Sequence, residues 1–370
     1  MSNALGIIFS NIHDKHNPEL TKERTMASIP FACRYRLIDF ALSNMVNAGI
    51  VNVGIIANKH YQSLINHVGS GKDWDLARKY GGLVIIPPFS DRSYDTLYHN
   101  RLEALKSAQV YISNATEEYV ILSDCDAASN IPLADVLAKH IEENADVTCV
   151  YRRQTVGDSP ETVFTLNNKG KITDIGVYSN MPGQRNVSIN ITVMKRTLLL
   201  TFISDAIAHG YSSMSRDILA PNLDSYKIMA YKFDGYYAQI NSLESYYRED
   251  MRLLDKDVRD TLFGNDERPV YTRIKDSFST KYGDDAKVVN SMIADGCIIE
   301  GTVENCILHR CVKIGKGAVV KNSIIMRDTI ISDNANLNCV VSDRNVVVKD
   351  GRNLSGCEDL PFYIAKGKMI

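Results

Sequence analysis

The chain has 370 residues, a formal net charge of −2 and a sequence pI near 6.5. This length favours two or three domains, each large enough to bury a core of its own. A near-neutral charge without a basic stripe argues against binding to nucleic acid. The apolar runs are much shorter than the roughly 20 residues of a membrane-spanning helix. The chain does not open with a secretory leader, so we expect a cytoplasmic protein with no membrane partner.

Eight cysteines are scattered along the sequence, and no two of them form a C-x-x-C pair. Paired spacings of that kind are typical of metal sites and redox motifs. We therefore expect reduced and mostly buried thiols, as is usual for a cytoplasmic protein.

Short apolar runs alternate with segments of helical spacing from the start of the chain to Tyr151. The apolar runs predict five buried strands: Leu5–Phe9, Val53–Ala57, Leu83–Ile86, Tyr119–Ser123 and Val147–Tyr151. Alternating strands and helices predict an α/β fold, with a mostly parallel sheet covered by helices on both faces. Ligands of such sheets bind beyond the carboxyl ends of the strands, so we expect the loops after Phe9 and Ser123 to face one cleft.

Further elements follow along the chain. Phe164–Leu166 and Lys171–Tyr178 are predicted to form a hairpin laid over the sheet, and Val187–Met194 is predicted to return as a strand. Lys195–His209 and Ser242–Leu254 have helical spacing. The residues after this second helix are charged and irregular, which is typical of a linker.

The pattern changes between residues 290 and 350. Apolar residues there recur mostly five or six positions apart, with small or polar residues between them. Repeats this short are typical of the coils of a parallel β-helix, in which each coil covers the apolar face of its neighbour. The predicted domains are therefore an α/β domain over residues 1–254, a linker over 255–289 and a β-helix over 290–370.

Four stretches carry a resemblance to a known family: LTKERTMASIPFACRYRLIDFALSNMVNAGI (20–50), HVGSGKDWDL (67–76), GGLVIIPP (81–88) and FDGYYAQINSLESYYREDMRLL (233–254). They are similar to the bacterial glucose-1-phosphate adenylyltransferases, also called ADP-glucose pyrophosphorylases, of glycogen synthesis. The resemblance covers essentially the whole chain. It implies a nucleotidyltransferase domain (GT-A/Rossmann-like) followed by a left-handed parallel β-helix of the hexapeptide type.

Adenylyl transfer from ATP to a sugar phosphate requires backbone N–H groups around the phosphates, cations to neutralise them and two carboxylates to hold Mg²⁺. In the catalytic relatives a glycine-rich loop with an arginine follows the first strand. The corresponding loop Ser10–Lys15 has no glycine, and residues with a Cβ avoid the backbone conformations that such a loop needs. Asp14 adds a negative charge there. We expect His13, Lys15 and His16 to lie in a solvated loop rather than to bind phosphate.

Other catalytic positions of the family are also changed. Met26 stands where the family has a lysine, and Gln239 stands where it has an aspartate that binds metal. Asn190 replaces a glycine, and Asp174–Asn180 lacks the lysine on the sugar side. A neutral amide cannot replace the charge of a metal-binding carboxylate. The resemblance therefore implies that this chain has no functional catalytic residue, and it assigns no nucleotide-binding residue.

The stretch Ser123-Asp124-Cys125-Asp126 stands where the family has its first metal carboxylate, and it offers two candidates, Asp124 and Asp126. Either could bind a metal alone, but we expect each to cap the following turn. We therefore predict no metal and no cofactor for this chain, although the catalytic relatives use Mg²⁺. This pattern of losses resembles the GlgD-type regulatory subunit, a non-catalytic paralogue of the enzyme.

Two arginines of the family are retained. Arginines at the positions of Arg24 and Arg36 help to bind phosphorylated sugar effectors at the domain junction in the family. A guanidinium group suits this role because it binds phosphate through paired hydrogen bonds and stays charged. The alternative is that both arginines form ordinary surface ion pairs.

The resemblance implies a regulatory, non-catalytic subunit that assembles with a catalytic paralogue into a hetero-oligomer, expected to be a tetramer, with a homo-oligomer as the alternative. Sugar phosphates or related metabolites are the expected effectors. A weakly active enzyme with Asp124 or Asp126 as its sole metal ligand is one alternative function, and a free-standing metabolite sensor is another. An acyltransferase would need a histidine base in the β-helix, where His309 is the only histidine.

Overall fold

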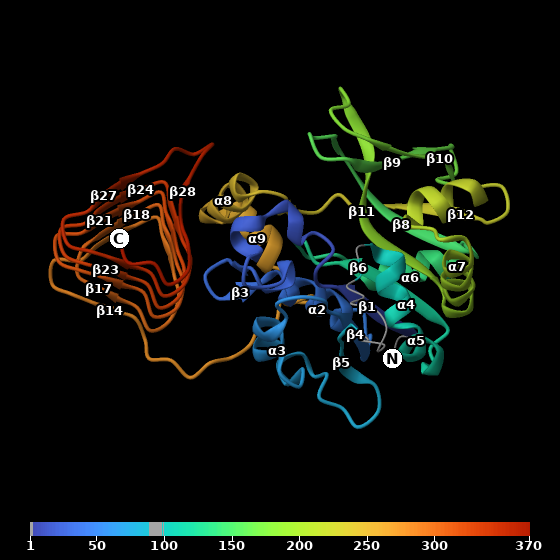
Figure 1. The fold of residues 1–370 in the computed structure, drawn as a ribbon, viewed down its shortest axis with the longest axis horizontal. Coiled ribbons are helices and arrows are strands. Elements are labelled where there is room, and N and C mark those ends of the chain that lie inside the picture. Colours follow the sequence, from blue (N-terminus) through green and yellow to red (C-terminus); the bar gives the residue numbers. More distant parts are fainter. Residues whose placement is uncertain (1–2, 89–97, 99) are drawn as a thin grey trace.

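The computed structural model describes residues 3–88, 98 and 100–370. Figure 1 shows an α/β domain, coloured from blue to yellow, beside a β-helix coloured orange to red. The two parts correspond to the two architectures that the sequence predicts.

The α/β domain is built on a nine-stranded sheet with the order β10–β9–β11–β6–β1–β4–β5, in which β8 also pairs with β11 and β12. The strands are β1 Ala4–Phe9, β4 Asn52–Ile56, β5 Gly82–Ile86, β6 Tyr119–Asp124, β8 Val147–Thr155, β9 Glu161–Leu166, β10 Ile172–Tyr178, β11 Gln184–Lys195 and β12 Ile228–Lys232. Strands β5, β4, β1 and β6 run parallel, and the β9–β10 hairpin is antiparallel. The five predicted strands, the pairing of the hairpin and the returning strand are confirmed. The hairpin does not lie over the sheet as predicted: β9 pairs with β11, so β9 and β10 extend the sheet at one edge.

The register of the parallel strands brings the loops of the candidate site together. Phe9, at the end of β1, pairs with Ile56 at the end of β4 and with Asp124 at the end of β6. The loops that follow these strands therefore start from one edge of the sheet, as expected for a ligand cleft in an α/β fold.

Helices cover the sheet and connect its strands. They are α1 Pro18–Thr21, α2 Leu37–Asn47, α3 Gln62–Val68, α4 Arg101–Ser107, α5 Gln109–Asn114, α6 Leu133–Glu142, α7 Arg196–His209, α8 Leu243–Met251 and α9 Lys256–Phe263. Two of them match the predicted helices closely, and α9 lies within the segment predicted as a linker. Helix α8 begins after Ser242, whose hydroxyl accepts a hydrogen bond from the backbone N–H of Ser245 at 3.0 Å, a standard N-terminal cap.

Short strand pairs complete this domain. They are β2 Pro30–Phe31 with β3 Tyr35–Arg36, and β7 Ala127–Ser129 with β13 Tyr237–Gln239. The turn between β2 and β3 places Ala32 and Cys33 at φ values of 49° and 65°. Such angles cost roughly 1–2 kcal/mol for a residue that carries a Cβ, so the surrounding packing must hold this turn in place.

Three parallel sheets of five strands form the β-helix. The first is β14 Lys281–Tyr282, β17 Ile298–Ile299, β20 Lys313–Ile314, β23 Ile330–Ile331 and β26 Val347–Val348; the second is β15 Lys287–Val289, β18 Thr302–Glu304, β21 Val319–Lys321, β24 Asn336–Asn338 and β27 Asn353–Ser355; the third is β16 Met292–Ile293, β19 Ile307–Leu308, β22 Ile324–Ile325, β25 Val340–Ser342 and β28 Phe362–Ile364. The register pairs Ile307 with Ile324, so equivalent residues of these coils lie 17 positions apart. This architecture, a left-handed parallel β-helix, confirms the predicted one.

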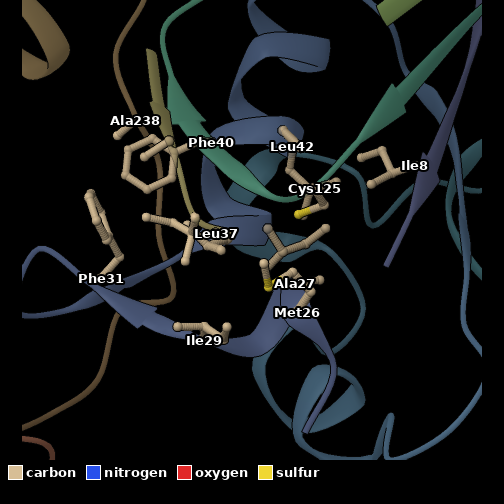
Figure 2. Packing of buried hydrophobic residues seen from close by; sticks show 14 of the residues in the cluster. Ile8, Met26, Ala27, Ile29, Phe31, Leu37, Phe40, Leu42, Cys125 and Ala238 are labelled. Carbon is tan, nitrogen blue, oxygen red and sulfur yellow. The ribbon is translucent and has the colours of Figure 1, made fainter. Parts of the chain in front are cut away.

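The two parts share one hydrophobic core. The largest cluster combines the side chains around α2 with buried side chains of the β-helix, four of which are fully buried: Ile307, Ile324, Met326 and Val341. Figure 2 shows part of this cluster, in which Leu37 lies between Phe40 on one side and Met26 and Ala27 on the other. The β-helix is therefore packed on the α/β domain through apolar side chains and not only tethered to it.

The eight cysteines all lie among the described residues, and none of them forms a disulfide; six are buried. In the part of the chain that the structure describes, no helix has the length and apolar character to cross a membrane.

Candidate functional site

A cluster of charged side chains lies at the carboxyl ends of β1 and β6, and Asp124 is at its centre. The Nε2 atom of His13 lies 2.6 Å from Oδ2 of Asp124. The Nε–H of Arg101 donates to Oδ1 of Asp124 at 3.0 Å, and the same guanidinium group makes a second contact with Oδ2. Only 1% of the Asp124 side chain is exposed. The carboxylate is thus held between two cationic groups.

Three elements position these side chains. Asp124 is the last residue of β6, and Arg101 is the first residue of α4. The side-chain oxygen of Asn100 caps that helix by accepting the backbone N–H of Glu103 at 2.9 Å. His13 lies in the loop after β1, which Asp14 stabilises from within.

The carboxylate of Asp14 accepts hydrogen bonds from Nδ2 of Asn11 at 2.6 Å and from the backbone N–H of Met26 at 2.7 Å. Burial raises the pKa of Asp14 to about 6, against the opposing effect of these hydrogen bonds. The predicted negative charge in this loop is therefore turned inwards, where it fixes the loop conformation that presents His13.

Electrostatics keep the cluster charged. Burial alone would lower the pKa of His13, but the carboxylates of Asp126 and Asp124 outweigh it and raise that pKa. Burial would likewise raise the pKa of Asp124, but Arg101 and His13 hold it well below its usual range. The two carboxylates therefore favour the charged form of the imidazole, which lies beside them with the guanidinium group of Arg101.

Asp126 and Gln239 complete the cluster. The Nε2–H of Gln239 donates to Oδ2 of Asp126 at 3.3 Å, and Nε2 of His13 lies 3.8 Å from the same oxygen. The pairing of β7 with β13, which aligns Ala127 with Gln239, brings these two side chains together. Within the described residues, the site where the family would hold a metal is therefore lined by two acids, an amide and two cations.

These residues do not fit Mg²⁺. Among residues 3–88, 98 and 100–370, His13, Asp124 and Asp126 form the one group of three side chains close enough to ligate an ion. Mg²⁺ prefers oxygen ligands in an octahedral arrangement. Here the oxygens of Asp124 are bound by Arg101 and His13, and the amide that replaces the second family carboxylate directs its N–H at Asp126.

The structure brings some of the changed catalytic positions of the family together. Asp124, Asp126 and Gln239 meet in this cluster, whereas Met26 is a core residue with 1% exposure. The structure also corrects two expectations. Asp124 binds two cations instead of capping a turn, and His13 is largely buried, although Lys15 and His16 next to it are exposed.

Asn190 lies on the neighbouring strand β11 with φ of 58°. This left-handed conformation suits a glycine, which the resemblance expects here, and asparagine tolerates it better than most residues. Its side chain, with Ser188 and Arg101, lines a cavity of only about 30 Å³. Ligand pockets usually measure about 300–1,000 Å³, so this space is far too small for a sugar phosphate.

Arg24 joins the two parts of the molecule. Its Nη2 donates to Oδ1 and Oδ2 of Asp343 in the β-helix at 2.5 and 2.6 Å. The hydroxyl of Tyr363 donates to the same carboxylate at 3.1 Å. Arg24 is 1% exposed, so it forms an ion pair as the alternative proposed, but in the interior and not at the surface.

Arg36 lies on the other side of the same junction. Its Nη1 donates to the backbone oxygen and to the hydroxyl of Ser63 at 2.8 and 3.0 Å. Burial, followed by the positive charges of Arg344 and others, lowers the pKa of Arg36 to about 9. The structure thus places the two retained arginines in different roles, with Arg36 facing a group of like charges.

That group is a column of arginines on the β-helix, which the sequence reasoning missed. Arg310, Arg327 and Arg344 follow the three successive strands β19, β22 and β25 at the same register position, 17 residues apart. Adjacent strands of a sheet lie about 4.8 Å apart, so the three residues lie beside one another on successive coils. Arg310 is paired with Asp295 and Arg327 with Asp328. The 17-residue spacing of arginine was the available sequence signal.

Several buried nitrogens of this junction lack a partner among the described residues: Nε of Arg24, Nε of Arg344 and Nε2 of His309. Burial, with the charges of Arg310 and Arg24, lowers the pKa of His309 to about 3. Because His309 is also only 3% exposed, it does not suit the role of the general base that an acyltransferase would need.

Two family models match separate parts of the chain, one within the α/β domain and one within the segment that ends in the β-helix. Residues 18–166 match the nucleotidyl transferase family, and residues 276–358 match the GlmU-like C-terminal hexapeptide family. The fold and the site therefore define a nucleotidyltransferase domain joined to a hexapeptide β-helix.

Curated relatives are similar over nearly the whole length. The chain is 35% identical over 364 residues to the glycogen biosynthesis protein GlgD of Bacillus subtilis (strain 168), and 38% identical over 368 residues to the GlgD protein of Geobacillus stearothermophilus; each alignment covers 98% of this chain and 96% of the relative. It is 30% identical over 309 residues to a glucose-1-phosphate adenylyltransferase of Clostridium botulinum (strain Alaska E43 / Type E3), covering 82% of this chain and 80% of the relative. The chain belongs to the GlgD branch of the glucose-1-phosphate adenylyltransferase family, which confirms the resemblance.

Proposed function

We propose that this chain is a regulatory, non-catalytic subunit in glycogen biosynthesis. It would assemble with a catalytic glucose-1-phosphate adenylyltransferase chain, the enzyme that converts ATP and glucose 1-phosphate into ADP-glucose and diphosphate. The names of its relatives support the pathway, and the cluster around Asp124 supports the absence of catalysis.

One observation carries the non-catalytic assignment: Arg101 and His13 bind the carboxylate of Asp124 at the end of β6. Two positive charges therefore already neutralise the carboxylates that a catalytic relative needs for its metal. Removing one electrostatic donor from an active site costs about 2.7–4 kcal/mol of transition-state stabilisation. In this chain the glycine loop, a lysine and a metal carboxylate of the family are all changed. The losses need not add, but together they predict a very low rate of adenylyl transfer.

The arginine column supports the regulatory part of the proposal. Arg24 is bound to Asp343, and the Nε atom of Arg327 forms an ion pair with Oδ2 of Asp328 at 3.0 Å. We therefore take Arg36 and Arg344 as the cations of this junction that would bind an anionic effector. Guanidinium groups bind phosphate through paired hydrogen bonds. Like charges held close together, with an unpartnered nitrogen on Arg344 within the described part of the chain, favour a bound anion that relieves their repulsion. Sugar phosphates carry such an anion.

The test uses both chains. ADP-glucose formation by the catalytic relative is measured with and without this chain, across a range of sugar phosphate concentrations. We expect this chain to change the rate and its response to the effector, because allostery requires an effector to favour one state of the assembly.

Arg36→Ala or Arg344→Ala should weaken the response about tenfold, as expected for one lost charge-assisted contact. Lys313→Ala, on an exposed strand of the β-helix, is the matched control and should respond as the wild type does. Two chains that do not co-purify, or arginine variants with an unchanged response, would rule out the regulatory proposal.

A further inference from the structure

A second cavity lies away from both sites described above. It is bounded by the C-terminal end of α2, by the loop over residues 72–78 and by Tyr271 of the linker, and it measures about 520 Å³. Pockets that bind small molecules usually measure about 300–1,000 Å³. The cavity shares no lining residue with the cluster around Asp124 or with the arginine column, so neither site accounts for it.

The loop that forms one wall is tightly closed. Lys72–Trp74 form one turn of 3-10 helix between Gly71 and Asp75, which have left-handed φ values of 80° and 54°. A Cβ on Gly71 would lie 2.9 Å from the Cβ atoms of Leu76 and Leu83, so this position requires glycine. The backbone N–H of Leu76 donates to the backbone oxygen of Gly71 at 2.9 Å and closes the loop.

Both walls are anchored to the α/β domain. The indole ring of Trp74 packs edge to face on His67, with 5.9 Å between the ring centroids. Nε2 of His67 in turn lies 2.5 Å from Oδ1 of Asp39 in α2. On the linker side, the backbone N–H of Tyr271 donates to Oγ of Ser43 in α2 at 2.9 Å. The cavity is therefore preformed, and a ligand would bind with little ordering of the chain.

The floor of the cavity is apolar. Val46, Ile50 and Leu76 line it, and the last two of these side chains are fully buried. Trp74 forms part of the wall and is only 2% exposed, whereas Tyr271 is 39% exposed and presents an aromatic ring at the rim. Aromatic rings with one wet side suit ligands that have both an apolar face and polar groups.

The charges of the lining cancel. Lys72 and Arg78 are positive, and Asp73 and Asp75 are negative. Nε–H of Arg78 donates to the backbone oxygen of Asp75 at 2.8 Å, and Oδ1 of Asp73 accepts the backbone N–H of Ile274 at 3.3 Å. A phosphate group would meet two carboxylates here, and a cation would meet two positive side chains. The lining therefore favours a neutral ligand that both donates and accepts hydrogen bonds.

We propose that this cavity binds a neutral sugar ring, either as a free sugar or as a unit of an α-glucan chain. Each sugar hydroxyl donates and accepts hydrogen bonds, which matches the mixed charges of the loop. The C–H faces of the ring are apolar and suit the floor and the ring of Tyr271. A hydroxyl seated against the wall would supply the acceptor that Nε1 of Trp74 lacks among the described residues.

The choice of glucose-based sugars rests on the glycogen pathway of the proposed function, whereas the cavity itself does not depend on it. If the ligand is a glucan chain, the site would hold this subunit beside the polymer that its pathway extends. The site thus adds a carbohydrate contact to a chain that is proposed to act through its partner.

The test uses the purified full chain and its single tryptophan. Because Trp74 is the only tryptophan, its fluorescence reports on the wall of this cavity. Calorimetric titration with maltose and with maltoheptaose gives the affinity, and the emission of Trp74 is followed in parallel. We expect saturable binding at millimolar concentrations with a matching change in emission. Retention on sedimented glycogen assigns the site to glucan chains, and maltose binding without retention assigns it to free sugars.

Variants of Tyr271 connect the binding to this cavity. Tyr271→Ala removes the ring at the rim and should weaken maltose binding about tenfold, whereas Tyr271→Phe keeps the ring and should bind close to the wild type. Tyr80→Ala is the matched control, because Tyr80 is 82% exposed and does not line the cavity. Lys72→Ala, an exposed residue of the opposite wall, should weaken binding several-fold without touching the linker.

Two results would overturn the inference. One is the absence of saturable binding with both maltose and maltoheptaose. The other is binding that leaves the emission of Trp74 constant and that Tyr271→Ala and Lys72→Ala do not weaken, since the sugar would then be bound elsewhere. The assay needs neither a partner chain nor turnover. A chain that regulates its partner without binding sugars refutes only the sugar site, and a chain that binds sugars without affecting its partner contradicts only the regulatory role.

Discussion

The Asp124 carboxylate shows how two cationic side chains, His13 and Arg101, act together at one site. Sequence alone marks His13 as part of a changed loop, but it does not single out Arg101 among the arginines of the chain. The contacts of Asp124 span 111 residues to His13 and 23 to Arg101. Only the register of β1 with β6 and the start of α4 bring the three side chains together, so the internal neutralisation of this site could not be predicted.

A first prediction concerns the pH dependence of the His13 contact. The pKa of His13 in the folded chain is raised above its ordinary value of 6.5. The charged contact therefore stabilises the fold fully below about pH 6.5, and this stabilisation is lost as the pH rises through the raised value. His13→Gln should reduce the free energy of unfolding by about 1–3 kcal/mol at about pH 6 and by less at about pH 9. Urea denaturation at the two pH values measures it, and an equal effect at both would contradict the charged contact.

A second prediction concerns the Arg24–Asp343 ion pair. Removing one member of a buried pair leaves an uncompensated charge and typically costs about 3–5 kcal/mol. Arg24→Ala and Asp343→Ala should each destabilise the chain on that scale. Arg24→Met combined with Asp343→Leu should recover much of the loss, because a buried apolar pair needs no partner. Thermal or urea unfolding of the three variants tests this, and additive losses in the double variant would show that the two side chains are not coupled.

At the scale of elements, the sequence was most informative where periodicity is strong. The strands β1, β4, β5, β6 and β8 were predicted to within a few residues, since short apolar runs between turn residues leave little ambiguity. The coils of the β-helix were predicted from apolar spacing. What the spacing could not show is which outer face packs on the other domain. Ile307, Ile324 and Val341 recur every 17 residues and look like interior residues, yet they belong to the shared core.

A third prediction follows from that shared core. Deleting residues 290–370 removes Ile307, Ile324, Met326 and Val341 from a cluster in which all four are fully buried. Each buried side chain of this size contributes about 1.5–3 kcal/mol, and the deletion exposes the apolar surface that they cover. We expect an aggregated or poorly folded product. Size-exclusion chromatography and circular dichroism measure it. A soluble, folded fragment would show that the α/β domain does not depend on the β-helix.

At the scale of the whole molecule, the fold is that of a nucleotidyltransferase with a β-helix, and the changes are concentrated where the chemistry would occur. The scaffold is retained because its core is spread over both parts, whereas the charged groups of the site are few and could be exchanged without loss of packing. The junction between the two parts carries a column of arginines, to which the reaction gives no role. This contrast supports the proposal that the chain acts by assembling with a catalytic subunit and not by its own turnover.

A fourth prediction tests whether one residue could restore the site. Gln239→Asp returns a carboxylate next to Asp126, but Arg101 and His13 still neutralise Asp124 and the loop after β1 still lacks glycine. The variant should therefore show no more adenylyl transfer than the wild type. Its ADP-glucose formation, followed by chromatography, provides the measurement, and a clear gain of activity would show that the other changes are not limiting.

The most direct test of the non-catalytic assignment is the rate at which the purified chain alone forms ADP-glucose from ATP, Mg²⁺ and glucose 1-phosphate. A catalytic relative at the same concentration is the positive control. Because cations occupy the carboxylate of Asp124, and the amide of Gln239 stands beside Asp126 in place of a metal-binding carboxylate, we predict no turnover above the rate without protein. Removing a single electrostatic donor from an active site already lowers the rate about a hundredfold or more. Sustained turnover within about a hundredfold of the catalytic relative would therefore contradict the account.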